Sequence, residues 1–533
     1  MRDDFVRRNA ADEKVMHEVV FAVKQRNLDQ IEKTLFEVSD PASPKYGKYL
    51  SRDEVGRLTE NRDSTVKIQQ FLLKSGATVV HTTPYGEYIT ALAPIATWQT
   101  LFATTFYDFE HVEKNTKVQR CAHYSLPTDI LDHVESVFNT VQLPPRMALK
   151  TLVSQPMNAT AKGSVTPSLL NSYYHITSNT GNSLASQSLF ESLEQYYSPS
   201  DLTTFQKQFN LPVEAVAQDI GGYVSDQECL DDANNCAEAN LDVQYIMAVS
   251  QNTPTTYWYD GSSDSFLSWI KAVAATPNPP LVHSISYGAI EPELPKSTSN
   301  AFNTEAMKLG AQGVSILVSS GDDGVANFQA RSNPKKCGYN PSFPASSPYV
   351  TAVGATQGPE SGTTEIACTS DQGGVITTGG GFSTIFSAPS YQTATISGYF
   401  SGLSSAHTPA SGYATSGRGY PDVSMAGYNY EVIIGGKTYA LSGTSASAPV
   451  VAGMVSLVNA NRLKAGKSAL GFLNTALYKY GTQLTNDVTS GENNCAASKV
   501  CCDQGFYASK GWDPLTGFGS LDYTKFANVF QNL

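Results

Sequence analysis

The residues that most constrain this 533-residue chain lie near its C-terminal end, where small residues join a short strand to a long apolar helix. Residues 439–441 are expected to form the strand, and the helix is expected to open near Pro449, because proline is tolerated in a first helical turn. The residues after Pro449 are apolar on nearly every face, which is typical of a helix buried inside a large domain. The turn of residues 442–448 is therefore attached to a rigid core element.

Ser445 stands in this turn, and its surroundings favour a nucleophile. Small neighbours let another backbone approach the hydroxyl closely, and a nucleophilic serine requires nearby backbone donors on a rigid support. An ordinary Ser/Thr-rich helix cap is the alternative interpretation. The whole string, Ser-Gly-Thr-Ser-Ala-Ser-Ala-Pro, resembles the nucleophile segment of subtilisin-like serine peptidases, and more closely that of the sedolisin, or serine-carboxyl, peptidases.

The base that activates the serine distinguishes these two families. Subtilisin-like enzymes carry a His-Gly-Thr segment. The histidines beyond residue 163 are His175, His283 and His407, and none of them is followed by glycine. Glu238 and Asp242 are better placed, because residues four apart share one face of a helix and this helix is largely apolar. Two like charges there raise at least one pKa and favour a shared proton. The resemblance implies that Glu238 is the base on Ser445 and that Asp242 orients it.

A further acid, Asp322, follows residues 315–319, which predict a buried parallel strand. An acid at the C-terminal end of such a strand points into the crevice where α/β folds bind ligands. The segment Ser-Gly-Asp-Asp-Gly resembles the sedolisin oxyanion-hole motif, which implies that a protonated Asp322 donates a hydrogen bond to the oxyanion. Together with a carboxylate base, this predicts activity at acidic pH. The adjacent Asp323 either shifts the pH profile or faces solvent.

The remaining pattern predicts two domains joined by a linker. Residues 1–18 are charged, contain no visible signal peptide and are expected to form an N-terminal tail. Residues 19–142 predict an α+β, ferredoxin-like domain, and the phrase that begins at Asp40 resembles the sedolisin propeptide, which blocks the active site until it is removed. Residues 143–163 are linker-like and are expected to contain the maturation site and the sequon at Asn158. Residues 164–533 predict an α/β catalytic domain with a subtilisin-like, doubly wound parallel sheet.

Two acidic turns near the C-terminus supply hard oxygen ligands of the kind that calcium prefers. Resemblance to the sedolisin calcium site implies one structural Ca²⁺, held by two carboxylates and three carbonyl groups: the side chains of Asp487 and Asp513 and the carbonyls of Val488, Ser509 and Gly511. The family usually has glycine where Ser509 stands, which matters only if this position requires a positive φ. Two acidic turns without a metal are the alternative.

Composition restricts the partners and the compartment. The net charge of −12 and the absence of a basic run argue against nucleic acid, and no segment is apolar enough to span a membrane. Clustered cysteines without neighbouring histidines favour disulfides over metal sites and indicate an oxidising compartment: Cys229 with Cys236, and Cys495, Cys501 and Cys502. Cys337 and Cys368 are expected to form a further pair, which leaves Cys121 alone.

These features predict an acid-active serine-carboxyl peptidase that works through an acyl-enzyme. Resemblance to the eukaryotic secreted branch implies that it releases tripeptides from the free N-termini of peptides and unfolded proteins. We expect a monomer that is inhibited by its own propeptide and is secreted, or resides in a vacuole or lysosome. A sedolisin-type endopeptidase and a non-catalytic binding protein on the same fold are the two alternatives.

Overall fold

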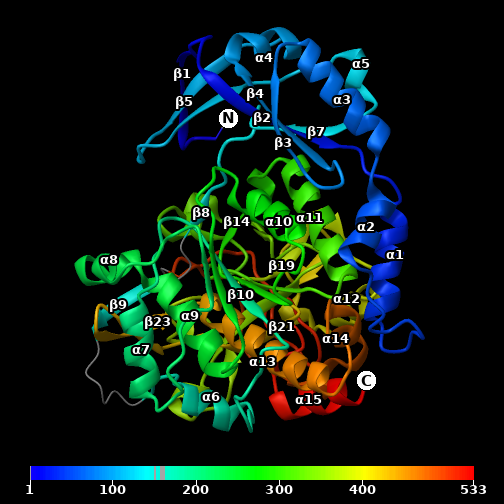
Figure 1. The fold of residues 1–533 in the computed structure, drawn as a ribbon. Helices are drawn as coiled ribbons and strands as arrows, with labels where there is room; N and C mark the ends of the chain where they lie inside the picture. The colour runs from blue at the N-terminus through cyan, green and yellow to red at the C-terminus, as the bar shows by residue number, and fades with distance from the viewer. Residues whose placement is uncertain (1, 149–151, 157–162, 498) are drawn as a thin grey trace.

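The computed structural model describes residues 2–148, 152–156, 163–497 and 499–533, and Figure 1 shows a smaller N-terminal domain resting on a larger α/β domain. The smaller domain has an antiparallel sheet in the order β3-β4-β2-β7, which is the ferredoxin-like order expected from the sequence. Its elements are β1 (Phe5–Ala10), β2 (Met16–Val23), α1 (Leu28–Ser39), α2 (Arg52–Thr59), α3 (Arg62–Lys74), β3 (Thr78–Thr82), β4 (Tyr88–Pro94), α4 (Ile95–Phe102), β5 (Phe106–His111), β6 (Lys117–Cys121), α5 (Thr128–Leu131) and β7 (Val134–Phe138).

The N-terminal residues correct one prediction. The sequence predicts a tail over residues 1–18, whereas the structure places β1 and the start of β2 there. Strand β1 pairs with β5 at the edge of a small sheet, so most of its side chains face water and only Phe5 is buried, against Phe109 and Val118. A charged edge strand of this kind lacks the apolar alternation by which strands are recognised in a sequence.

Strand β2 is buried on both faces, which explains how the two domains are joined. Val19 and Phe21 point into the core beneath α3 and α4, together with Trp98. On the opposite face, Val20 and Ala22 belong to an apolar cluster that continues into the larger domain. The N-terminal sheet therefore lies directly on helices α10 (Ser265–Ala275) and α11 (Lys296–Ala311), as Figure 1 shows.

Two further contacts fasten the N-terminal domain to the larger one. Helix α1 runs along the side of the larger domain, where Ile31 and Leu35 pack with Met307 of α11 (Figure 1). Beneath the N-terminal sheet, the buried Lys308 ammonium group lies 3.2 Å from a carboxylate oxygen of Glu87 and 3.0 Å from one of Glu305. The interface thus combines apolar packing with a buried ion-pair network.

The larger domain is built on a ten-stranded, mainly parallel sheet, which confirms the predicted α/β fold class. Its path is β11 (Gln218–Ile220), β12 (Thr255–Tyr259), β10 (Gln187–Glu191), β13 (Val282–Ile285), β15 (Ser315–Ser319), β17 (Thr351–Gln357), β21 (Val423–Ala426), β25 (Ser520–Leu521) and β24 (Thr485–Asn486), with β18 (Ile366–Ala367) paired to β17. Smaller antiparallel pairs lie outside it: β14 (Gly288–Ile290) with β16 (Ser342–Phe343), β19 (Gly381–Ser387) with β20 (Gly417–Tyr420), and β22 (Tyr430–Ile434) with β23 (Lys437–Ser442).

Helices cover both faces of this sheet, as a doubly wound fold requires. Helices α10 and α11 pack on one face, and the fully buried helix α9 (Ala237–Val249) packs on the other against α13 (Thr444–Lys464). Gly453 makes this packing possible, because a Cβ atom there would lie 2.7 Å from Cβ of Val249. The remaining helices are α6 (Pro167–Tyr173), α7 (Pro199–Gln208), α8 (Asp226–Asp231), α12 (Thr393–Gly402), α14 (Asn474–Tyr480) and α15 (Tyr523–Asn532).

Disulfides close loops in the larger domain, and one predicted pairing is wrong. The bonds join Cys229 to Cys236, Cys337 to Cys502 and Cys495 to Cys501. Cys368 does not pair with Cys337, because it is buried beside β18, where its thiol donates to the carbonyl of Ile376. Cys121 is unpaired and buried, as expected. In the part of the chain that the structure describes, every helix is too short or too polar to cross a bilayer.

Candidate active site

Three neighbouring strands deliver the polar residues of the site to one edge of the sheet. Phe190 of β10, Ile285 of β13 and Val318 of β15 are in register. The residues that follow them, Glu191 and Ser286, therefore emerge side by side, and Asp322 follows from the turn after β15. This edge is the carboxyl end of the parallel sheet, where α/β folds place their binding crevices.

Helix α9 contributes the two predicted carboxyl groups, and both are almost completely buried. The exposed fraction is 1% for Glu238 and 0% for Asp242. Their spacing of four residues places them on one face of the helix, as predicted from the sequence. The helix cannot turn them towards solvent, because every residue from Ala237 to Val249 is buried.

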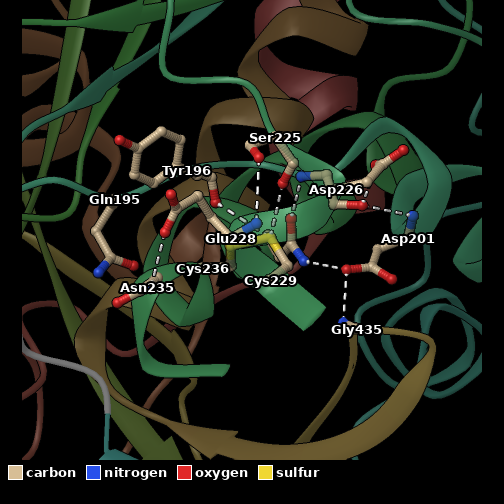
Figure 2. Close-up of a disulfide and its surroundings, with 12 residues drawn as sticks. Gln195, Tyr196, Asp201, Ser225, Asp226, Glu228, Cys229, Asn235, Cys236 and Gly435 are labelled. Carbon is tan, nitrogen blue, oxygen red and sulfur yellow. Dashed lines mark hydrogen bonds between the residues drawn. A yellow bond between two sulfur atoms is a disulfide. The ribbon is translucent and has the colours of Figure 1, made fainter. Parts of the chain in front are cut away.

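The N-terminal end of α9 is fixed by a disulfide and by a glutamine side chain (Figure 2). Cys236 precedes the helix without capping it through its own side chain, but its bond to Cys229 ties the helix end to α8. The Glu238 N–H group instead donates to Oε1 of Gln195 at 3.0 Å, and Nε2 of Gln195 donates to the carbonyl of Asn234 at 2.8 Å. Gln195 thus satisfies a helix-end donor from outside the helix and holds the backbone of Glu238 in place.

Glu191 adds a third carboxyl group that the sequence interpretation missed. It is fully buried, and the Tyr287 hydroxyl donates to its Oε2 atom at 2.7 Å. Burial, followed by the charges of neighbouring carboxyl groups, raises the pKa values of Glu191 and Asp242 well above their usual range, while the Ser286 hydroxyl lowers that of Asp242 slightly. Glu191 is the last residue of a buried strand, and Asp322 lies shortly after the end of another. This position at the carboxyl end of a parallel strand is the sequence signal that could have identified Glu191.

The nucleophile candidate lies at the start of α13, which begins five residues before Pro449, so the predicted start of the helix near Pro449 is wrong. Pro449 has no N–H group, so the helix cannot close its usual hydrogen bond to the carbonyl of Ser445. That carbonyl accepts a long hydrogen bond from the Ser286 hydroxyl (3.4 Å), and the Ser445 hydroxyl donates to the Ser286 carbonyl at 3.2 Å. Ser286 therefore connects Ser445 to the carboxyl groups around it.

Asp322 is hydrogen-bonded to Thr444, the residue that precedes Ser445. One of its oxygens, Oδ1, accepts hydrogen bonds from the Thr444 N–H group (2.8 Å) and hydroxyl group (2.9 Å). The turn that carries Asp322 packs tightly against Gly379, where a Cβ atom would lie 2.5 Å from the Ser320 carbonyl oxygen. Of the two interpretations for Asp323, exposure to solvent is wrong, because this side chain is buried and paired with Arg331.

Two described strands of the linker pair with strands that adjoin residues of the site. Strand β8 (Met147–Ala148) pairs antiparallel with β14, which begins directly after Tyr287. Strand β9 (Leu152–Pro156) pairs antiparallel with β23, which leads into Ser445. A cavity of about 1220 Å³ lies between the two domains, and Met147 of β8 is among the residues that line it. The sequon at Asn158 lies outside the described residues, as does part of the segment predicted to contain the maturation site.

The predicted calcium ligands come together on two turns. Asp487 Oδ2 accepts from the Gly511 N–H group at 3.0 Å, and Asp513 Oδ2 accepts from the Ser509 N–H group at 3.0 Å. The Thr516 hydroxyl contacts both Asp513 and the carbonyl of Val488. Ser509 is not among the described residues with positive φ, so serine is compatible with this position.

This arrangement fits a hard cation. Asp513 is completely buried, and its oxygens accept hydrogen bonds from neutral backbone groups, which leave its negative charge to be compensated. Among the described residues, no group of three or more His, Cys, Asp or Glu side chains is placed to hold a metal ion. A calcium ion bound here would therefore depend on carbonyl oxygens as well as on the two carboxylates.

Comparison with known proteins gives the family. The model for the pro-kumamolisin activation domain matches residues 3–143, and the model for the subtilase family matches residues 251–476. Tripeptidyl-peptidase 1 of Rattus norvegicus and that of Homo sapiens are each 34% identical to the chain over 534 residues, covering 96% of the chain and 91% of each relative. The chain belongs to the sedolisin family of serine-carboxyl peptidases.

A solved structure of Pseudomonas sedolisin, a serine-carboxyl proteinase, shares this fold. The TM-score is 0.55 at 23% sequence identity, and the match covers 70% of this chain and 99% of the Pseudomonas chain. In this sedolisin-family chain, the N-terminal domain is an activation domain and the larger domain is a serine-type peptidase. The subtilase match spans both Asp322 and Ser445.

The buried carboxyl cluster predicts how stability depends on pH. Because the pKa values of Glu191 and Asp242 are raised in the folded protein, it binds more protons than the unfolded chain does. The stability that the protonated Glu191 and Asp242 contribute to the fold is fully present below their unfolded-state pKa of about 4. This stability is lost as the pH rises through their folded-state pKa values. In a Ser445→Ala background, Glu191→Gln should raise the thermal midpoint at pH 7 by roughly 3–6 °C and have little effect at pH 4. The exposed Glu194→Gln is the matched control, and an equal rise at both pH values would contradict the account.

Proposed function

We propose that the mature chain is an acid-active tripeptidyl-peptidase in which Ser445 is the nucleophile. The observation that carries this proposal is the convergence of Ser445, Glu238, Asp242, Glu191 and Asp322 at one edge of the sheet. Sequence identity over most of the two tripeptidyl-peptidase 1 chains supports the choice of activity. The substrates are peptides and unfolded proteins with a free N-terminus.

The first chemical step is the attack of Ser445 Oγ on the scissile carbonyl. Glu238 accepts the hydroxyl proton, and Asp242 behind it shares and orients that proton. The new C–O bond forms as the carbonyl π electrons move onto oxygen, and a protonated Asp322 and the Ser445 N–H group donate hydrogen bonds to that oxyanion. Collapse of the intermediate breaks the C–N bond, and Glu238 returns the proton to the leaving amine. Water then hydrolyses the acyl-enzyme by the same sequence.

Acidic conditions serve two groups in this scheme. Asp322 donates a hydrogen bond only while it is protonated, as a carboxylic acid in an oxyanion hole must be. The raised pKa values of Glu191 and Asp242 keep protons within the buried cluster, so that one carboxylate can act as the base beside neutral neighbours. Both conditions are lost as the pH approaches neutrality.

The propeptide acts as an intramolecular inhibitor in this proposal. Its support is the pairing of linker strands β8 and β9 with the two strands that flank the site. Such strands occupy the backbone donors and acceptors that an extended substrate would use. Removal of the N-terminal domain and linker would open the site, and we expect the mature enzyme to be a monomer.

An acid-incubation experiment tests the activity. The full chain is held at about pH 4, and its size and its release of tripeptides from a free-amine peptide are followed beside Ser445→Ala. We expect loss of the N-terminal domain and linker together with tripeptide release, whereas the variant should lose about 10⁶-fold in rate. A matched peptide with a blocked N-terminus should not be cleaved. Internal cuts in both peptides would instead indicate an endopeptidase, and a folded but inactive chain would favour a binding protein.

A structural Ca²⁺ completes the proposal, with Asp487, Val488, Ser509, Gly511 and Asp513 as the residues that would hold it. When bound, the ion would neutralise two carboxylates and join the two turns. Calcium at about 100 times its dissociation constant should raise the thermal midpoint by roughly 5–10 °C over the protein in chelator. Asp487→Asn should abolish this rise, and the exposed Asp503→Asn should preserve it. A rise of equal size in Asp487→Asn would contradict the assignment.

The disulfides support the compartment that we propose. Three bonds in the peptidase domain require oxidising conditions for their formation and persistence. Together with an acidic working range, they support a secreted enzyme or one that resides in a vacuole or lysosome.

A further inference from the structure

We propose that Asp323 is a positioning residue that neutralises Arg331 and thereby keeps the oxyanion-hole carboxyl of Asp322 protonated at the working pH. This inference rests on the proposed role of Asp322. It assigns a task to a second acid that the oxyanion-hole scheme does not itself use. Three features of the molecule support it: the geometry of the ion pair, the loops that hold it, and the charged groups around Asp322.

The Asp323–Arg331 ion pair is bidentate, has short donor–acceptor distances and is largely buried. The Arg331 Nε and Nη2 atoms donate to the two Asp323 oxygens at 2.6 Å and 2.8 Å. The exposed fraction of the side chain is 5% for Asp323 and 23% for Arg331. This fork geometry is the strongest form of a carboxylate–guanidinium contact, and it fixes both groups.

Two disulfide-closed loops hold the partners of Asp323. Arg331 ends the short 3₁₀ helix Phe328–Arg331, six residues before Cys337, which is bonded to Cys502. The Ala497 N–H group donates to Asp323 Oδ1 at 3.0 Å from inside the loop that the Cys495–Cys501 bond closes. On the other side, the Thr377 N–H group donates to the carbonyl of Asp322 at 2.9 Å. The pair is thus part of the framework that carries the oxyanion turn.

The charges around Asp322 explain why this pair matters for catalysis. Arg331 is permanently charged and interacts electrostatically with Asp322 as well as with Asp323. A cation alone would favour the ionised form of Asp322, which cannot donate a hydrogen bond. Asp323 supplies the compensating charge. The buried Cys368 thiol also interacts electrostatically with Asp322, and burial raises its pKa well above the usual range, so it is neutral at acidic pH.

Charge substitutions on either side of the pair should move the pH profile in opposite directions. Asp323→Asn keeps an oxygen for the Ala497 N–H group but leaves Arg331 uncompensated, which should lower the pKa of Asp322. The basic limb of the kcat/KM profile should then move down by about half to one pH unit. Arg331→Gln leaves Asp323 uncompensated and should move the same limb upward by a similar amount. Arg331→Lys keeps the charge and should leave the limb in place.

The experiment is a pH profile of kcat/KM for the acid-matured enzyme and these three variants, with thermal midpoints measured in parallel. Opposite shifts in Asp323→Asn and Arg331→Gln, with no shift in Arg331→Lys, would support the proposal. Shifts in the same direction, or lower activity without any shift, would overturn it and indicate a purely structural pair. An inactive parent enzyme would instead refute the proposed function, and so the two failures are distinguishable. If Asp323→Asn does not mature, the contrast between Arg331→Gln and Arg331→Lys decides the matter.

Discussion

The site depends on the burial of acidic groups beside a serine. Such burial lowers the stability of a fold, but it is useful for catalysis. Taking a carboxylate out of water is unfavourable unless it is paired or protonated, so a cluster of buried carboxyl groups retains protons. Here Glu191 comes from the sheet and Glu238 and Asp242 come from a helix that is buried along its whole length. The large core around α9 and α13 stabilises the domain sufficiently to tolerate this arrangement.

Two different devices fix the groups around the serine. The cluster side is held by backbone contacts: Gln195 holds the start of α9, and Ser286 exchanges hydrogen bonds with Ser445. The side of the site that carries Asp322 is held by loops, which two disulfides and the Asp323–Arg331 pair restrain. The covering domain adds the third layer, because its linker strands pair with the strands on either side of the serine. In the proposed function, acid acts on the catalytic groups themselves, beneath a domain that is removed during maturation.

Local pattern predicted much of this molecule. The strand over residues 315–319 has the predicted bounds, and spacing alone placed Glu238 and Asp242 on one face of a helix. The misses have physical reasons. The charged edge strand β1 lacks apolar alternation, and α13 begins before Pro449 because Ser286 satisfies the carbonyl that proline leaves unbonded. The place of Glu191 in the cluster and the pairing of Cys337 depend on residues far apart in sequence that only the assembled sheet and loops bring together. The Arg331–Asp323 contact spans eight residues and depends on the irregular turn between them.

The most direct test of the account measures protonation in the buried cluster. Carbon-13 NMR of carboxyl-labelled Glu and Asp residues, recorded on the Ser445→Ala protein across the acidic range, reports each titration. Glu191→Gln and Asp242→Asn variants would assign the signals. We expect at least one carboxyl group of the cluster to remain protonated well above the ordinary range of roughly 4 for such groups. If every carboxyl group of the cluster were ionised by about pH 5, shared protons could not underlie the activation of Ser445, and the central claim would be contradicted.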